Sequence, residues 1–309
     1  PRGASNQRSR KGNPILNRQK ENRADAERRS RMATLTWTGG GDGTTFTAAA
    51  NWGGTAPSND DTLIINSTNK AIAGAATGLT GITLRVGKGF TGTLGSSTTY
   101  LDLDGPLLEF AAANAYHYLT GTWTDVRIIG GSSSSNFLYF KNNASTVITT
   151  LTCSALNGRV EIGSSASLTT VNMNGTMLGT VDIKSGVSSL TTINCTLGQV
   201  LTASTCTTAN ALGGTIKSSG TAAFTTIECD GSGSFEHLSS GTVTTLNVYD
   251  GTFDHRQNET AGFTLTNATV YAGGKIRGDG SLDNVTYTNG VSLQGGQASF
   301  PIGSTVSVS

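Results

Sequence analysis

The stretch from residue 189 to residue 200, SLTTINCTLGQV, contains the pattern that decides the fold. A Thr-Thr pair at 191 and 192 is followed at alternate positions by the apolar residues Ile193 and Cys195. Alternation with a period of two predicts a β-strand with one buried face. A glycine and a second apolar residue, Gly198 and Val200, follow a few positions later.

The same pattern recurs along the chain. From residue 149 onward, Thr-Thr pairs begin at residues 149, 169, 191, 207, 225 and 244, at intervals of 20, 22, 16, 18 and 19 residues. Four positions after the first Thr of each pair, the residues are Cys153, Met173, Cys195, Ala211, Cys229 and Val248. We expect these equivalent positions to stack as a ladder inside one common core.

A second ladder follows in each repeat, two residues after a glycine. Its members are Val160, Val181, Val200, Ile216, Phe235, Phe253 and Ile276. Because each repeat is too short to bury its own apolar face, it must stack on its neighbours. The sequence therefore predicts an all-β fold, a single-stranded parallel β-helix or solenoid with coils of about 19 residues. A β-sandwich lacks such a ladder, and propeller blades need about 40 residues.

The ladder also accounts for the cysteines. Cys153, Cys195 and Cys229 share positions with small or medium apolar residues, so we expect reduced side chains in the core. Met or Ala stands between them on adjacent coils, which disfavours a disulfide between neighbouring coils. Cys206 lies outside the ladder and has no evident partner. No spacing matches CxxC, which disfavours a zinc site.

The chain divides into four regions on this pattern. We expect a basic N-terminal arm over 1–33, an N-terminal cap over 34–69, irregular β-helix coils over 70–145, and regular coils with a C-terminal closure over 146–309.

The cap region contains Trp37, a Gly-rich turn, Phe46, Asn51-Trp52, Pro57 and Asp61 before an apolar strand. This arrangement resembles the start of many β-helical surface proteins, including phage virion proteins of the decoration, fibre or tailspike type and autotransporter passengers. The resemblance implies a cap in which Trp37, Trp52 and Pro57 cover the open core and the strand edge of the first coil. The alternative is an aromatic pair that stacks on a sugar.

The arm is strongly basic. Residues 1–31 hold ten Lys/Arg against three Asp/Glu, a net charge of +7. Residues 32–309 hold eleven Lys/Arg against seventeen Asp/Glu, a net charge of −6. We expect an extended or partly helical anchor in which nine of these ten basic residues bind the partner: Arg8, Arg10, Lys11, Arg18, Lys20, Arg23, Arg28, Arg29 and Arg31. Nucleic acid is disfavoured as its partner, because no aromatic residues interleave with the charges for base stacking.

One constellation of polar residues suggests chemistry. Glu236 and Asp254 occupy outward positions one coil apart, with His237 and His255 at the next positions. They are weak candidates for a glycosidase pair and a metal site, and the alternative is a solvated edge of the solenoid. Because no third ligand is in view, we expect no catalytic residue, no metal and no cofactor. His117 is predicted to be a packed surface residue.

A further ladder is predicted on the outer face of the Thr-rich strand. Stacked amides there would hydrogen-bond along the solenoid. Its members are Asn172, Asn194, Asn210, Glu228 and Asn247.

The leading hypothesis is a non-enzymatic structural protein of a bacteriophage virion, a decoration, fibre or spike that binds other virion proteins through the arm. We expect a homo-oligomer, and the resemblance implies a trimer; a host surface glycan is a candidate partner. No apolar stretch approaches the ~18 residues that span a bilayer, and the N-terminus has no apolar signal-peptide core, so we expect no membrane insertion. The alternatives are a bacterial cell-surface adhesin or passenger domain, and a tailspike that cleaves glycans with Glu236 and Asp254.

Overall fold

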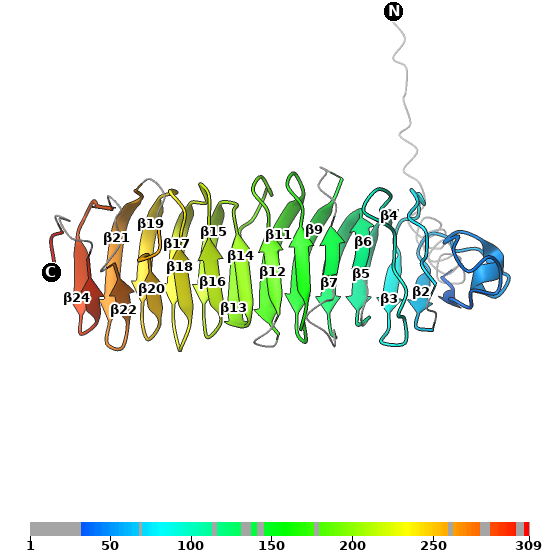
Figure 1. Cartoon of the computed structure of the whole chain (residues 1–309), viewed down its shortest axis with the longest axis horizontal. Coiled ribbons are helices and arrows are strands. Elements are labelled where there is room, and N and C mark those ends of the chain that lie inside the picture. Colours follow the sequence, from blue (N-terminus) through cyan, green and yellow to red (C-terminus); the bar gives the residue numbers. More distant parts are fainter. Residues whose placement is uncertain are drawn as a thin grey trace, which may run out of the picture.

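The protein is a parallel β-solenoid. In the computed structural model its coils stack along one long axis, with the N-terminal coils at one end and the C-terminal coils at the other (Figure 1). The structure describes residues 32–67, 70–112, 116–130, 137–140, 145–175, 179–258, 262–278, 285–300 and 306–308. The predicted all-β parallel β-helix is confirmed. The basic residues predicted to form the arm lie outside the described residues.

Two parallel sheets run the length of the solenoid. The long sheet has 14 strands: β1 (Thr34–Thr36), β2 (Thr62–Ile65), β3 (Thr83–Val86), β5 (Gly105–Phe110), β7 (Thr122–Ile128), β9 (Val147–Cys153), β11 (Ser167–Asn174), β13 (Thr192–Leu197), β15 (Cys206–Ala211), β17 (Phe224–Cys229), β19 (Val243–Val248), β21 (Thr264–Tyr271), β23 (Thr286–Tyr287) and β24 (Val291–Gln294). The short sheet has 11 strands: β4 (Leu101–Asp102), β6 (Tyr116–Thr120), β8 (Phe137–Phe140), β10 (Arg159–Ile162), β12 (Thr180–Ile183), β14 (Gln199–Thr202), β16 (Thr215–Ser218), β18 (Ser234–His237), β20 (Thr252–Asp254), β22 (Lys275–Arg277) and β25 (Gln297–Ser299). Each coil thus contributes one strand to the long sheet and, through most of the rod, one to the short sheet.

The strand register contains both predicted ladders. In the long sheet Met173 pairs with Cys153 on one side and with Cys195 on the other. In the short sheet Val181 pairs with Val160 and with Val200. Side chains about one coil apart in the sequence therefore lie on neighbouring strands, as the intervals between the Thr-Thr pairs predict.

Alternating burial follows from this register. In β19 the apolar Val243, Leu246 and Val248 are buried, whereas Asn247 on the outer face is half-buried. One hydrophobic cluster extends without interruption from Leu35 in the first coil to Val291 in the last. The core is therefore a continuous apolar column along the rod axis.

All four cysteines are free and buried. This confirms the predicted core position of Cys153, Cys195 and Cys229, and Cys206, for which no core position was predicted, is buried as well. Burial raises the pKa of the Cys195 and Cys206 thiols to about 12. Cys206, for which no partner was evident, donates to the backbone oxygen of Thr208 at 3.1 Å.

The N-terminal coil is closed by three aromatic side chains. Trp37 and Trp52 meet edge to face with ring centroids 5.0 Å apart, and Phe46 lies 5.3 Å from Trp52. Trp52 ends the only helix within the described ranges, a 3₁₀ turn over Ala49–Trp52. The neighbouring Gly-rich loop is held by Asn51, whose Oδ1 accepts the backbone N–H groups of Gly41 and Gly43 at 3.0 and 2.9 Å.

The two ends of the rod also include Pro57, the third predicted cap residue, and the C-terminal strands. Pro57 is half-buried in the loop that leads to β2. At the C-terminal end β25 pairs with β22, and Val308 forms an isolated parallel bridge with Val291.

The prediction for His117 is wrong. Its side chain is 1% exposed and lies in the core, 4.7 Å from Phe110 between ring centroids, with Nδ1 accepting the Leu94 N–H at 3.3 Å. The reason is the period of two in β6: Tyr116 and Tyr118 point outward, so the residue between them points inward.

Candidate functional site

The outer face of the short sheet carries the polar and aromatic side chains that bear on function. Strand register places one outward residue of each coil in a single file, which we call the outer column. Its members are Tyr118, Tyr139, Glu161, Asp182, Leu201, Lys217, Glu236, Asp254, Arg277 and Ser299.

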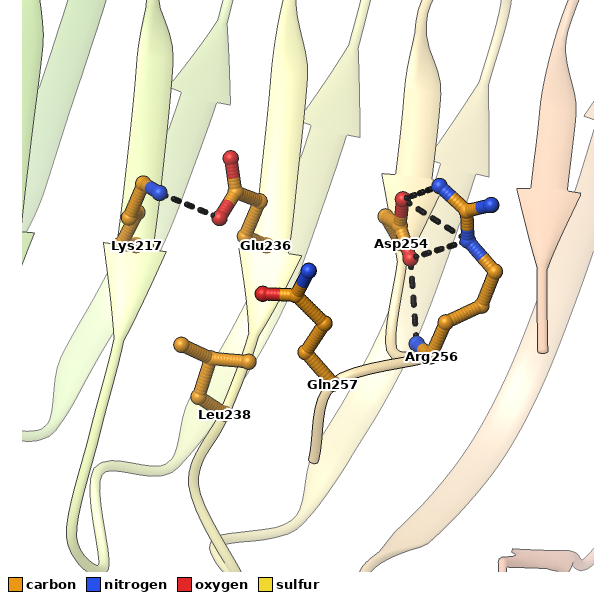
Figure 2. A pocket seen from close by; sticks show the side chains of 6 residues that line it. All are labelled: Lys217, Glu236, Leu238, Asp254, Arg256 and Gln257. Atoms are coloured by element: carbon orange, nitrogen blue, oxygen red, sulfur yellow. Dashed lines mark hydrogen bonds and ion pairs between the residues drawn. The ribbon is translucent and has the colours of Figure 1, made fainter. Parts of the chain in front are cut away.

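Glu236 and Asp254 are neighbours in this column, as predicted, because β18 pairs with β20. Each carboxylate has its own cation. Lys217 Nζ lies 2.6 Å from Glu236 Oε2, and Arg256 Nη2 lies 2.7 Å from Asp254 Oδ2 (Figure 2). The backbone N–H of Arg256 also donates to Asp254 Oδ1 at 3.0 Å.

These side chains line an open pocket of about 220 Å³. Leu238 and Gln257 complete its wall, and Gln257 extends from the loop after β20 toward Glu236 (Figure 2). Two carboxylates and two cations balance the charge of the wall. The pocket therefore presents hydrogen-bonding groups without a net electrostatic preference for a charged ligand.

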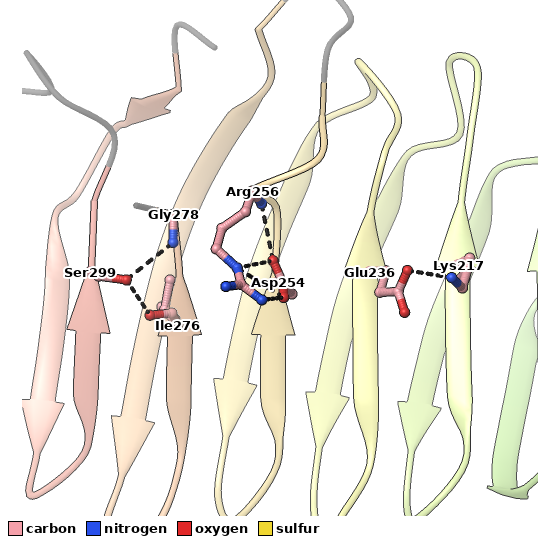
Figure 3. A network of polar contacts seen from close by, with 7 residues as sticks. All are labelled: Lys217, Glu236, Asp254, Arg256, Ile276, Gly278 and Ser299. Carbon is pink, nitrogen blue, oxygen red and sulfur yellow. Dashed lines mark hydrogen bonds and ion pairs between the residues drawn. The ribbon is translucent and has the colours of Figure 1, made fainter. Parts of the chain in front are cut away.

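The same face continues toward the C-terminal end (Figure 3). Ser299 Oγ there accepts the Gly278 N–H at 3.3 Å and donates to the Ile276 oxygen at 3.4 Å. These contacts tie β25 to β22, so this end of the face is occupied by contacts between coils.

The environment of Asp254 favours its ionised form. Partial burial by itself would raise the pKa of this carboxyl, but the hydrogen bonds from Arg256 and the charges of Arg256 and Arg277 outweigh burial and hold the pKa below its usual value. A glycosidase acid instead needs a raised pKa so that it holds a proton to donate. Asp254 is therefore suited to accept hydrogen bonds.

The structure does not bring the two histidines together with the two carboxylates. His237 and His255 are fully buried, since they occupy the inward positions that follow Glu236 and Asp254. His237 Nδ1 lies 3.1 Å from Ser218 Oγ, and His255 Nε2 lies 3.0 Å from the Tyr287 hydroxyl. In the described part of the chain, no group of three or more His, Cys, Asp or Glu residues is placed to hold a metal ion.

Burial also sets the charge of the histidines. It lowers the pKa of His237 to about 3, with a further contribution from His255. Burial alone lowers the pKa of His117 to about 3. His237 and His117 are consequently neutral core residues at physiological pH.

A second group of charges lies nearer the N-terminal end of the outer column. Asp182 forms ion pairs with Arg159 and with Lys184, the latter at 2.7 Å. Lys184 also reaches Glu161 at 3.3 Å. Two acidic and two basic side chains thus neutralise one another across adjacent coils.

A cluster of tyrosines at the N-terminal end of the same face was missed by the sequence reasoning. We call it the tyrosine column: Tyr100, Tyr116, Tyr118 and Tyr139. The rings of Tyr118 and Tyr139 stack at 5.1 Å and 7°, and Tyr100 meets Tyr118 edge-on at 5.5 Å. The Tyr-x-Tyr spacing of β6 is the signal that could have revealed it, because it places two tyrosines on the outer face of one strand.

The cap aromatics do not offer a sugar-binding face. Trp37 is 0% and Trp52 is 3% exposed, so their rings contact each other and the core. The alternative interpretation of this pair as a sugar-stacking site is therefore wrong, and the pair closes the end of the apolar column.

No described helix has the length and apolar character needed to cross a membrane. No protein-family model matches the chain, and neither a curated protein nor a solved structure is significantly similar to it.

Proposed function

We propose that the protein is a non-enzymatic structural rod of a bacteriophage virion, a decoration, fibre or spike that projects from the particle. The β-solenoid is compatible with a surface fibre, a spike or an adhesin. The observation that carries the proposal is the state of the outer column, where Asp182, Glu236 and Asp254 are each paired with a cation. The pairs of Asp182 with Arg159 and of Glu236 with Lys217 join neighbouring coils, and Asp254 is held by Arg256 of its own coil. Carboxylates held in this way are not poised to transfer protons.

The shape supports the same role. Every coil packs on the coils before and after it, and the apolar core is continuous from Leu35 to Val291. A stack of this kind is stiff along its axis and exposes two long side faces. Such a rod holds a distal surface at a fixed distance from an attachment point and offers its sides to further copies of the chain, so a homo-oligomer is part of the proposal.

The attachment point in this proposal is the basic arm. Residues 1–31 carry a net charge of +7, whereas residues 32–309 carry −6. An arm of one sign joined to a body of the other is attracted to acidic surfaces, including those of neighbouring virion proteins.

Deletion of residues 1–31 tests the anchor. We expect the shortened chain to fold into a rod with the circular dichroism and melting temperature of the full chain, but to be missing from purified particles. Immunogold labelling of particles and of host cells gives the location of the full chain.

The matched control keeps the length of the arm. A full-length chain in which the nine predicted anchoring cations are replaced by glutamine should also fail to join particles, because the proposal assigns the anchoring to charge. Incorporation of the shortened chain would refute the anchor, and label confined to the bacterial surface would favour the adhesin alternative.

A further inference from the structure

Among the described residues, the tyrosine column is the largest group of aromatic side chains on the outer face of the rod. Tyr116 is 47% exposed, and its ring stacks with that of Tyr139 on the next coil at 6.3 Å and 19°. Tyr118 also stacks with Tyr139, and Tyr100 extends the group by one coil. Because the rings contact one another, they form a preformed aromatic surface on the outer face of the rod.

The charges beside the tyrosine column cancel. The coils that follow β8 carry Arg159 and Glu161, then Asp182 and Lys184, two cations and two anions joined by ion pairs. Burial, together with Tyr118 and Glu161 nearby, raises the pKa of Tyr139, so its hydroxyl remains protonated and can donate a hydrogen bond at physiological pH. The surface combines aromatic rings and hydroxyl donors with no excess charge.

We propose that the tyrosine column, with the adjoining Arg159–Asp182 pair, binds a neutral glycan that lies along the rod axis. Sugar rings match this surface, because they have apolar C–H faces that pack on aromatic rings and hydroxyls that bond to tyrosine and to paired charges. Successive strands are about 4.8 Å apart, close to the length of one hexose in an extended chain, so each coil meets one sugar. This inference rests on the proposed role of the rod as a projecting surface protein and names its ligand.

Two other occupants fit the surface less well. A nucleic acid or an acidic glycan needs an excess of cations, and the four charges beside the column sum to zero. A second copy of the chain needs a broad apolar patch, whereas the neighbouring coils carry ion pairs. Retardation by an acidic polymer would reveal the first of these occupants, and a change of oligomeric state would reveal the second.

The test measures the migration of the full chain in native gels that contain β-glucan, galactomannan or pullulan, with polygalacturonate as an acidic polymer. We expect at least one neutral polymer to retard the chain, and this retardation to persist at high salt. Tyr116→Ala/Tyr139→Ala should weaken the apparent affinity about tenfold or more, as for a central aromatic contact. Tyr116→Ala alone, at the exposed end of the stack, should weaken it less and provides a variant whose folding is not at risk.

The matched control is a second tyrosine stack elsewhere on the rod. Tyr249 and Tyr271 stack at 4.7 Å and 11° at the end of the long-sheet strands, and Tyr249→Ala/Tyr271→Ala should leave the retardation unchanged. Any of four results overturns the inference. Two concern the parent chain: none of the three neutral polymers retards it, or only polygalacturonate retards it and salt abolishes the effect. Two concern the variants: the control variant loses as much retardation as the Tyr116/Tyr139 variant, or the Tyr116/Tyr139 variant has a changed oligomeric state in light scattering. Particle labelling is independent of these results, so loss of glycan binding with label still on virions would leave the proposed function standing.

Discussion

At the scale of single residues, the buried histidines make the rod sensitive to acid. The pKa of His237 is about 3 in the folded chain, because of burial and the neighbouring His255, against an ordinary value of 6.5. Below pH 6.5 the unfolded chain gains a proton that the folded chain does not, so stability is complete above pH 6.5 and is lost as the pH falls toward 3. Each such histidine contributes a slope of about 1.4 kcal/mol per pH unit in that window.

His237→Phe should remove one histidine's share of this slope. We expect the free energy of unfolding, measured with denaturant between pH 7 and 4, to fall less steeply in the variant than in the parent chain. Asp254 does not interfere, because the stability that its lowered pKa contributes is present above the ordinary carboxyl value of 3.8 and is lost only as the pH falls below that value. An unchanged slope would mean that His237 takes up its proton in the folded state.

The paired carboxylates lead to a second prediction at this scale. Glu236→Gln/Asp254→Asn removes both negative charges but preserves side-chain shape, so host adsorption and glycan release should be the same as for the parent chain. The measurement is reducing sugar released from host surface polysaccharide. Release by the parent that the double variant lacks would instead establish the glycan-cleaving alternative.

Sequence reasoning predicted the position of these carboxylates but not their partners. Glu236 and Asp254 are one coil apart, and the repeat alone places them side by side. Lys217 and Arg256 reach them through long flexible side chains, whose direction no repeat pattern determines. His117 was misplaced although the alternation around it was visible, because the coils near it lack the regular succession of Thr-Thr pairs that aligns the coils from residue 149 onward.

At the scale of elements, the amide ladder on the long sheet stabilises the contact between coils. Asn194 Nδ2 donates to Asn172 Oδ1 at 2.9 Å, and Asn210 Nδ2 donates to Asn194 Oδ1 at 2.8 Å, as the predicted stacking requires. The ladder stops at the next strand, where Glu228 pairs with Asn210. The buried Asn210 Oδ1 receives no hydrogen bond from the described residues, because an ionised carboxylate has no proton to donate.

Glu228→Gln should extend the ladder by one rung. The new amide can donate to Asn210 Oδ1, so we expect the free energy of unfolding to rise by about 1 kcal/mol. Glu228→Ala is the matched control, since it removes the charge without adding a donor. Equal effects of the two substitutions would show that loss of charge, and not the hydrogen bond, changes stability.

The regular coils and the coils between residues 70 and 145 differ in how far their strands could be predicted. The regular strands of the long sheet follow the Thr-Thr pairs, and the register matches the sequence intervals from β9 to β19. Between residues 70 and 145 the strands include the two-residue β4 and isolated bridges such as Ile72 with Leu94. Loops of unequal length separate these strands, so neither the register there nor the tyrosine column follows from a fixed interval.

At the scale of the whole molecule, a solenoid has two ends that differ from its middle. An internal coil is covered on both sides, but the first coil has an open strand edge and an open core. Here β2 is the only described strand that pairs with β1, and Trp37 and Trp52 close the core beneath it. We therefore expect the cap to protect the rod from end-to-end association with another rod, besides adding stability.

A comparison of two buried tryptophans separates these roles. Trp37 and Trp123 are both 0% exposed, one in the cap and the other inside β7. Replacement of either by Ala should cost about 3–5 kcal/mol from the lost packing. Only Trp37→Ala also opens the end of the core. Light scattering should therefore show concentration-dependent association of this variant below its melting temperature. Trp123→Ala should keep the assembly state of the parent chain. Equal association of both variants would assign the effect to general destabilisation, and the tryptophan cluster would then be ordinary core and not a barrier at the end of the rod.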